Sequence, residues 1–465
     1  MQRTVKIVSP VDGSVVAERN LASKDEIKKA LLSAVNAQKI WKNKNLSEKA
    51  SLCHKAIDCL LQKKQAIAKE ITLQMGRPIK YAAGELSGVE ERARYMIDIA
   101  EQELKDIAIE EDQAFTRFIR KEPLGVVLTI APWNYPYLTA INSIIPALMA
   151  GNTVILKHSA QTLLCAERLK VAFDEAGLPA GVFQYLHLDH AMTAELVKNN
   201  AIGFISFTGS VDAGKTIEST AATLFKSVAL ELGGKDPAYV MADADIKSTA
   251  ENLVDGAFFN SGQSCCAIER IYVHEKVYDD FIKQFISLVN QYQLNNPMQP
   301  STTLGPMVNS KAADFVREQI KQAVEKGALE CIDETNFLKS KSGTPYIAPQ
   351  VLINVDHTMS VMKDESFGPV IGIMKVSSDQ QAIALMNDSD FGLTASFWTN
   401  NIEKAIGLGE QVETGTVFMN RCDYLDPALA WTGVKQSGRG CSLSKLAYQQ
   451  LTRPKSFHLK NATHE

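Results

Sequence analysis

A cysteine and a glutamate in the middle of the chain have the residue types of a nucleophile and a general base. Cys265 lies within Gly262-Gln263-Ser264-Cys265-Cys266, and Glu231 lies 34 positions earlier within Leu230-Glu231-Leu232-Gly233-Gly234. A thiolate is strongly nucleophilic and adds to a carbonyl carbon, and a carboxylate held one water away can activate that water. Together the two motifs suggest oxidation of an aldehyde through a thioester that water then hydrolyses.

Each residue also has a simpler interpretation. A buried cysteine beside small residues usually packs in a core, and a glutamate at the end of an apolar strand is often exposed or ion-paired. Cys266 is either a packing residue or a redox partner of Cys265. Packing is favoured, because a bridge between adjacent cysteines closes a strained eight-membered ring.

Two further motifs change this balance. Ala131-Pro132-Trp133-Asn134-Tyr135-Pro136 and Phe207-Thr208-Gly209-Ser210, the latter followed by Gly214, precede the first pair. In this order and at these spacings, the four motifs resemble the aldehyde dehydrogenase superfamily, from about residue 5 to about residue 460. The resemblance implies that Cys265 is the nucleophile, that Glu231 is the base for hydrolysis, and that the Asn134 amide and the Cys265 backbone N–H stabilise the oxyanion.

The resemblance also implies a nicotinamide cofactor. Backbone N–H groups at a helix start and a close-approaching glycine fit a pyrophosphate, so Gly209, Ser210 and Gly214 are expected at the cofactor phosphates. Lys157 corresponds to the family lysine at the adenosine ribose, and Glu365-Ser366-Phe367-Gly368-Pro369 to the segment at the nicotinamide ribose. The residues expected at the cofactor are Trp133, Lys157, Ser159, Gly209, Ser210, Gly214, Leu232, Glu365 and Phe367.

One position bears on the choice between NAD and NADP. Strictly NAD-using members of the superfamily usually have an acidic residue where this chain has Ala160. A carboxylate repels a ribose phosphate, whereas alanine does not, and Ser159 can donate to that phosphate. We therefore expect NAD or NADP, with NADP tolerated.

The expected substrate tunnel is mostly apolar. By correspondence it contains Tyr135, Phe259, Leu425 and Trp431, which favour medium-chain aliphatic or aromatic aldehydes. The chain also resembles bacterial succinate-semialdehyde dehydrogenases, but the arginine that related semialdehyde enzymes carry six residues before the nucleophile is Phe259 here. Arg421 is the remaining candidate to bind a substrate carboxylate.

Two other functional classes are alternatives. Glu231 argues against a coenzyme-A-acylating enzyme, because such members typically lack that base. A catalytically silent structural or binding homologue is the remote alternative, and it would be expected to have lost Cys265, Glu231 or Asn134.

The pattern of elements predicts an α/β fold. Ser23-Lys24-Asp25-Glu26 opens a helix with a capping box, and one long helix is expected over 49–75, ending at Gly76-Arg77-Pro78. From Gly125, apolar strands expected at 126–130, 154–157, 182–186 and 202–207 alternate with helices, as in a doubly wound parallel sheet. Extended segments are expected at 115–121 and 455–460.

The resemblance implies an aldehyde dehydrogenase-like fold with three parts. A Rossmann-type dinucleotide-binding domain is expected over 1–104 and 124–232, and an α/β catalytic domain over 233–435. A small β oligomerisation segment is expected over 105–123 and 436–465, building a homodimer or homotetramer.

Composition excludes several classes of partner. The 465 residues carry a net charge of −4, which gives no footing for nucleic acid or an anionic membrane. No window reaches the roughly 20 apolar residues of a membrane helix, and the amino terminus resembles no targeting peptide, so a cytoplasmic protein is expected. Eight scattered cysteines and eight scattered histidines predict reduced thiols and no metal site.

Overall fold

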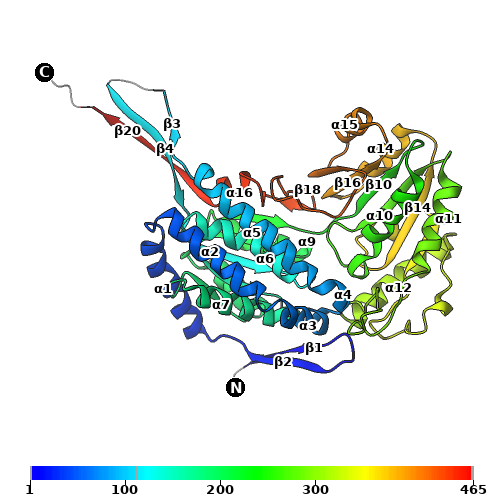
Figure 1. Ribbon diagram of the computed structural model, residues 1–465, viewed down its shortest axis with the longest axis horizontal. Coiled ribbons are helices and arrows are strands. Elements are labelled where there is room, and N and C mark those ends of the chain that lie inside the picture. Colours follow the sequence, from blue (N-terminus) through cyan, green and yellow to red (C-terminus); the bar gives the residue numbers. More distant parts are fainter. Residues whose placement is uncertain (1–2, 111–113, 462–465) are drawn as a thin grey trace.

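The computed structural model describes residues 3–110 and 114–461, which form two large sheets and smaller β ribbons (Figure 1). The expected domain ranges that begin at residue 1, cross 111–113 or end at 465 therefore include residues outside the described part. The chain is of mixed α/β class, as the sequence predicts.

The first sheet has six strands in the order β19-β9-β8-β5-β6-β7. They are β5 (Val126–Ala131), β6 (Thr153–His158), β7 (Phe183–Tyr185), β8 (Ile202–Thr208), β9 (Ser227–Glu231) and β19 (Gly438–Arg439), and only β19 runs antiparallel to its neighbour. All residues of β5 and β6 are buried, which explains their nearly continuous apolar composition. The strand order reverses between β5 and β8, and ligands of doubly wound sheets bind at such a point.

Helices cover both faces of this sheet. One core contains buried residues of α2 (Leu46–Leu61), α3 (Lys64–Met75), α5 (Gly84–Glu103), α6 (Pro136–Met149) and α7 (Leu163–Ala176). The opposite core contains residues of α1 (Lys24–Trp41), α8 (His190–Lys198) and α9 (Val211–Ala222). Short helices α4 (Ile79–Ala82) and α16 (Leu446–Gln450) lie in the same half of the molecule (Figure 1).

Most expected boundaries agree with the structure, with one error. The Ser23 capping box is present at the start of α1, and Gly76 ends α3 in a left-handed conformation with φ 88°. The single helix expected over 49–75 is wrong, because the chain forms α2 and α3 with a break at Gln62 and Lys63. No glycine or proline marks that break, so local sequence does not reveal it.

The second sheet has seven strands in the order β12-β13-β14-β11-β10-β16-β17. They are β10 (Asp236–Val240), β11 (Ile268–His274), β12 (Leu329–Glu330), β13 (Gln350–Ile353), β14 (Val370–Val376), β16 (Thr394–Trp398) and β17 (Thr416–Met419), all parallel to their neighbours except β12. One face packs on α10 (Ile246–Phe258) and α11 (Tyr278–Val289). The other packs on α12 (Ser310–Glu325), α13 (Ser360–Lys363), α14 (Asp379–Asn387) and α15 (Ile402–Gly409).

The remaining strands form ribbons at the periphery. β4 (Phe115–Pro123) pairs with β3 (Ile107–Ala108) and, along its whole length, with β20 (Thr452–Lys460), and this sheet projects from the body in Figure 1. β1 (Thr4–Val8) and β2 (Val15–Asn20) form an amino-terminal hairpin, and β15 (Phe391–Gly392) pairs with β18 (Val434–Lys435). Among the described residues, no helix is both long and apolar enough to cross a membrane.

Candidate active site

The segments that carry Glu231 and Cys265 come together where the chain passes from the first sheet to the second. β9 ends at Glu231, and the chain enters β10 at Asp236 through Leu232-Gly233-Gly234-Lys235. A Cβ placed on Gly234 would collide with the carbonyl oxygen of Cys265, so this segment lies directly against the Cys265 loop. Glycine at 234 is therefore what allows the two motifs to approach.

The two residues line one cavity of about 160 Å³. All four side chains expected in the substrate tunnel, Tyr135, Phe259, Leu425 and Trp431, line the same cavity. Its wall is more polar than the sequence predicted, because Arg92, Thr139, Asn142 and Asp423 also line it.

The Cys265 loop begins with a tight turn after α10. Asn260 and Ser261 have left-handed backbone angles, with φ 53° and 57°, and Gly262 follows with φ 69°. A Cβ on Gly262 would collide with the Gly368 carbonyl, so the loop also packs closely on the segment that follows Phe367. Cys265 is partly exposed to the cavity.

Cys266 differs from its neighbour in environment. It is buried, and its Sγ donates to Asp423 Oδ1 at 2.9 Å. The adjacent Cys265 side chain and burial raise the pKa of Cys266 well above its usual value. Cys266 is therefore held as a thiol, which agrees with a packing role and leaves Cys265 as the accessible candidate nucleophile.

Glu231 is held by two hydroxyl donors. Thr208 Oγ1 donates to Oε2 at 3.1 Å, and Ser442 Oγ donates to Oε1. Burial raises the pKa of Glu231, while both hydroxyl groups oppose that change. A carboxylate with a raised pKa is better matched to base catalysis near neutral pH.

Asn134 is fixed by its amide and by its backbone. Its Nδ2 donates to the carbonyl oxygen of Gln263 at 3.2 Å, two residues before Cys265. Its own carbonyl accepts from Arg77 Nη2. Asn134 thus joins the loop after β5 to the Cys265 loop, although its side chain is almost fully buried.

A buried ion pair behind Asn134 was missed by the sequence analysis. Arg77 Nη1 lies 2.5 Å from Glu85 Oε2, and both side chains are almost completely inaccessible. Glu85 Oε1 accepts from the backbone N–H groups of Tyr137 and Leu138 at the start of α6. In the sequence, Arg77 stands within Gly76-Arg77-Pro78, a motif that predicts a helix end and gives no signal of a buried ion pair.

The residues expected at the cofactor phosphates lie at the switch point of the first sheet. Gly209 and Ser210 follow β8, and Trp133 follows the neighbouring β5. The Ser210 side chain does not cap α9, so it leaves the first-turn N–H groups available to an anion. A Cβ on Gly214 would lie 2.6 Å from Leu232 Cδ2, which brings α9 close to the Glu231 segment.

The expected adenosine-ribose residues lie at the end of β6. Lys157 is buried, and burial lowers its pKa. Ser159 Oγ accepts from the Gln161 N–H at 3.3 Å, which leaves its hydroxyl hydrogen available to a ligand. Ala160 is exposed and brings no charge to this site.

The expected nicotinamide-ribose segment lies against the Glu231 and Cys265 loops. Glu365 Oε1 accepts from the Gly234 N–H at 3.0 Å, and the Phe367 ring lies 5.6 Å from that of Trp133. Burial and the nearby Glu269 raise the pKa of Glu365 to about 8.

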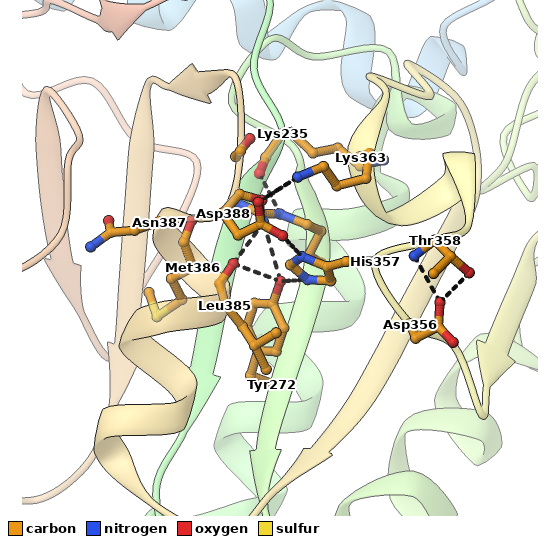
Figure 2. A network of polar contacts seen from close by, with 12 residues as sticks. Lys235, Tyr272, Asp356, His357, Thr358, Lys363, Leu385, Met386, Asn387 and Asp388 are labelled. Carbon is orange, nitrogen blue, oxygen red and sulfur yellow. Dashed lines mark hydrogen bonds and ion pairs between the residues drawn. The ribbon is translucent and has the colours of Figure 1, made fainter.

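Two side-chain networks hold this segment in place, and neither was expected from the sequence. Glu269 accepts from the Ser366 and Phe367 N–H groups and from Lys235 Nζ, the last at 2.6 Å. Figure 2 shows the second network, which is centred on Asp388. Lys363 Nζ lies 2.6 Å from Asp388 Oδ1, and His357 Nδ1 lies 2.5 Å from Asp388 Oδ2. Lys363 stands two residues before Glu365 in the chain. His357 also contacts the Tyr272 hydroxyl at 2.9 Å, which ties the network to β11.

These features fit a dinucleotide, because helix N–H groups, close-packed glycines and polar side chains suited to two riboses lie along the switch point. No group of three or more His, Cys, Asp or Glu residues suited to a metal occurs within the described ranges. Arg421, the candidate carboxylate anchor, is exposed; its guanidinium lies 4.0 Å from the Tyr424 ring centre and does not line the cavity.

Comparisons with known proteins agree with this geometry. The model of the aldehyde dehydrogenase family matches residues 1–457. An aldehyde dehydrogenase of Paenarthrobacter nicotinovorans is 36% identical over 97% of this chain and 99% of its own. An NADP-dependent glyceraldehyde-3-phosphate dehydrogenase of Streptococcus equinus is 34% identical over 97% of this chain and 94% of its own.

A solved structure of similar shape is the succinic semialdehyde dehydrogenase of Streptococcus pyogenes in complex with NADP+. It is 27% identical, with a TM-score of 0.93, over 98% of this chain and all of its own. The matched length, the two sheets and the Cys265–Glu231 cavity lead to one conclusion. This chain belongs to the aldehyde dehydrogenase family, whose members are NAD(P)-dependent oxidoreductases that act on aldehydes.

Proposed function

We propose that this protein oxidises a small aldehyde to the carboxylic acid through a covalent thioester on Cys265. The observation that carries the proposal is the shared cavity of Cys265 and Glu231, which come from loops attached to different sheets. A cavity of about 160 Å³ is smaller than the roughly 300–1,000 Å³ of a site for a drug-sized ligand, which favours a small substrate.

The first chemical step belongs to Cys265. Its thiolate adds to the aldehyde carbon, and the oxygen of the resulting thiohemiacetal is stabilised by the Cys265 N–H and the Asn134 amide. When bound, NAD or NADP supplies the hydride acceptor for the oxidation. The proposed ligand groups for that cofactor are Trp133, Lys157, Ser159, Gly209, Ser210, Gly214, Leu232, Glu365 and Phe367.

Glu231 serves the second step. As a carboxylate it takes a proton from water, and the hydroxide equivalent adds to the thioester and releases the acid and the Cys265 thiolate. Thr208 and Ser442 hold the carboxylate in position for this step. The presence of this base supports hydrolysis over transfer of the acyl group to coenzyme A.

Three finer assignments belong to the same proposal. Ala160 supports tolerance of NADP, because no carboxylate stands there to repel a ribose phosphate. The paired β4 and β20 support assembly into a homodimer or homotetramer, since an exposed strand edge invites pairing. Succinate semialdehyde is the narrower substrate alternative, suggested by the Streptococcus pyogenes enzyme, but Arg421 does not support it from its exposed position.

The test is formation of reduced nicotinamide by the purified chain with short aliphatic, aromatic and semialdehyde substrates, each with NAD and with NADP. Turnover is expected with the natural chain and absent in Cys265→Ala. In Glu231→Gln, mass spectrometry is expected to detect the acyl adduct on Cys265. Absence of Cys265-dependent turnover with every aldehyde would favour the catalytically silent alternative.

A further inference from the structure

An arginine that the proposed mechanism does not use lines the cavity of Cys265 and Glu231. Arg92 lies on α5 and is partly buried. Within the described ranges it is the only lysine or arginine that lines this cavity. Its guanidinium carries five N–H donors and remains protonated in proteins.

The packing of α5 against α6 places Arg92 at the cavity. Glu85, near the start of α5, caps the start of α6. One turn further, a Cβ on Gly88 would lie 3.0 Å from Leu138 Cδ2, so the two helices approach closely. Arg92 on α5 and Asn142 on α6 each lie one further turn along their helix. Arg92 Nη1 donates to Asn142 Oδ1 at 3.4 Å, a long hydrogen bond.

Within the part of the chain that the structure describes, the bond to Asn142 is the only hydrogen bond of the Arg92 guanidinium. Among residues 3–110 and 114–461, no carboxylate oxygen lies within 4.0 Å of its guanidinium. Burial lowers the pKa of Arg92, which reflects the cost of a cation removed from water without a close counter-ion.

The acidic residues around Arg92 are already engaged with other donors. Glu231 accepts from two hydroxyl groups, as described above. Asp423 accepts from Cys266 Sγ at 2.9 Å, and burial raises its pKa to about 6. Glu91 accepts from the Tyr424 hydroxyl at 2.5 Å, and Glu85 is paired with Arg77.

The cavity therefore offers one cation with polar neighbours in Thr139 and Asn142. The other lining side chains are apolar or aromatic, apart from the two cysteines, two hydroxyl residues and the two acidic residues already engaged, Glu231 and Asp423. A single guanidinium near acidic residues matches one negative charge better than the two charges of a phosphate group. Planar carboxylates are bound well by arginine through paired N–H groups.

We propose that Arg92 is a specificity-determining residue that binds the anionic end of the substrate. The preferred substrates are then small aldehydes with a singly charged carboxylate or sulfonate a short chain away from the carbonyl. This inference rests on the proposed function, because it assigns the far end of the substrate whose aldehyde reacts at Cys265.

The test compares charged and neutral aldehydes of similar size in the full-length protein. The substrates are 4-oxobutanoate, its methyl ester, and 3-oxopropane-1-sulfonate, and the variants are Arg92→Gln, Arg92→Lys and Arg421→Gln. Arg92→Gln is expected to lower kcat/KM for 4-oxobutanoate about 10- to 100-fold and that for the methyl ester less than about threefold. Arg92→Lys keeps the charge and should lose less.

Arg421→Gln is the matched control, because that arginine is exposed, packs over the Tyr424 ring and does not line the cavity. It should leave both substrates unchanged. The ratio of kcat/KM for 4-oxobutanoate to that for 3-oxopropane-1-sulfonate identifies whether carboxylate or sulfonate is the better end group. Equal values support recognition of a single negative charge, which both end groups carry.

A binding readout separates this inference from the proposed function. Succinate is expected to slow iodoacetamide alkylation of Cys265 in the natural chain and in Arg92→Lys, and to have no effect in Arg92→Gln. Equal loss of kcat/KM on charged and neutral aldehydes, or preference of the natural chain for the methyl ester, would overturn the role of Arg92. If no aldehyde is turned over, the proposed function fails, and the alkylation result alone decides whether Arg92 binds an anion.

Discussion

At Glu231, burial and hydrogen bonding act on the pKa of one carboxyl group in opposite directions. Burial raises the pKa, and the hydroxyl groups of Ser442 and Thr208 lower it by stabilising the carboxylate. A general base must be deprotonated, so hydrolysis of the thioester should be lost as the pH falls through the raised pKa of Glu231.

The Ser442→Ala variant tests this balance. Removing a donor that lowers the pKa of Glu231 raises that pKa further, so the acid limb of steady-state turnover should move to higher pH. The measurement is the pH profile of kcat with a saturating aldehyde, together with the profile of the pre-steady-state burst, which reports acylation. A shift to lower pH, or an equal shift in both profiles, would contradict this account of Glu231.

Residue 160 permits a second prediction at this scale. Ala160→Glu should lower kcat/KM for NADP by about tenfold or more, because the new carboxylate repels the ribose phosphate. The kcat/KM for NAD should be retained. Ala160→Gln is the matched neutral control and should change the NADP/NAD ratio much less. Cofactor affinity measured by fluorescence titration should follow the same order; an unchanged ratio in Ala160→Glu would place the adenosine ribose away from this residue.

At the scale of elements, the Arg77–Glu85 pair organises three segments around Cys265. Arg77 follows α3 and reaches the Asn134 carbonyl, and it donates to Asn260 Oδ1 at 3.1 Å. Glu85 caps α6 through two backbone N–H groups. The pair therefore couples the loop after β5, the start of α6 and the turn before Cys265.

Breaking that pair should be costly. Arg77→Met leaves the Glu85 carboxylate buried without its partner, and such changes typically destabilise a protein by about 3–5 kcal/mol. Arg3→Ala, which removes an exposed ion pair with Asp189, should cost no more than about 1 kcal/mol. Urea denaturation followed by circular dichroism compares the two, and similar losses in both variants would contradict a structural role for the buried pair.

At the scale of the whole molecule, the β4–β20 ribbon is the surface proposed for assembly. Phe118 and Phe457 stack across its strands with ring centres 4.5 Å apart, and Arg120 lies over both rings. Among residues 3–110 and 114–461, β20 pairs with a strand on one side only, so its other edge can pair with a second copy of the chain.

Phe457→Glu should shift the protein toward smaller species, because it places a charge on this ribbon. Light scattering coupled to size-exclusion chromatography measures the molar mass directly. Leu338→Glu is the control, since Leu338 is 86% exposed and lies away from the ribbon in the chain. An unchanged molar mass in Phe457→Glu would place the assembly surface elsewhere.

The expected division of the chain into domains does not account for every strand pairing in the structure. Strands of the two large sheets fall largely within the ranges expected for the first two domains. However, β19 lies within 436–465, the range expected for oligomerisation, and pairs with β9 at Leu230 and Glu231. The domain boundaries themselves stay a prediction.

The sequence by itself determined the family, the α/β class and the residue types at 134, 231 and 265, because motif order and spacing survive without coordinates. Local patterns also located the Ser23 capping box and the Gly76 helix end, which depend on neighbouring residues alone. Tertiary structure decided the break between α2 and α3, the Arg77–Glu85 pair, the exposed position of Arg421 and the presence of Arg92 in the cavity. Each of these depends on which distant side chains meet when helices and sheets pack, and a periodic pattern records only which face of an element is buried.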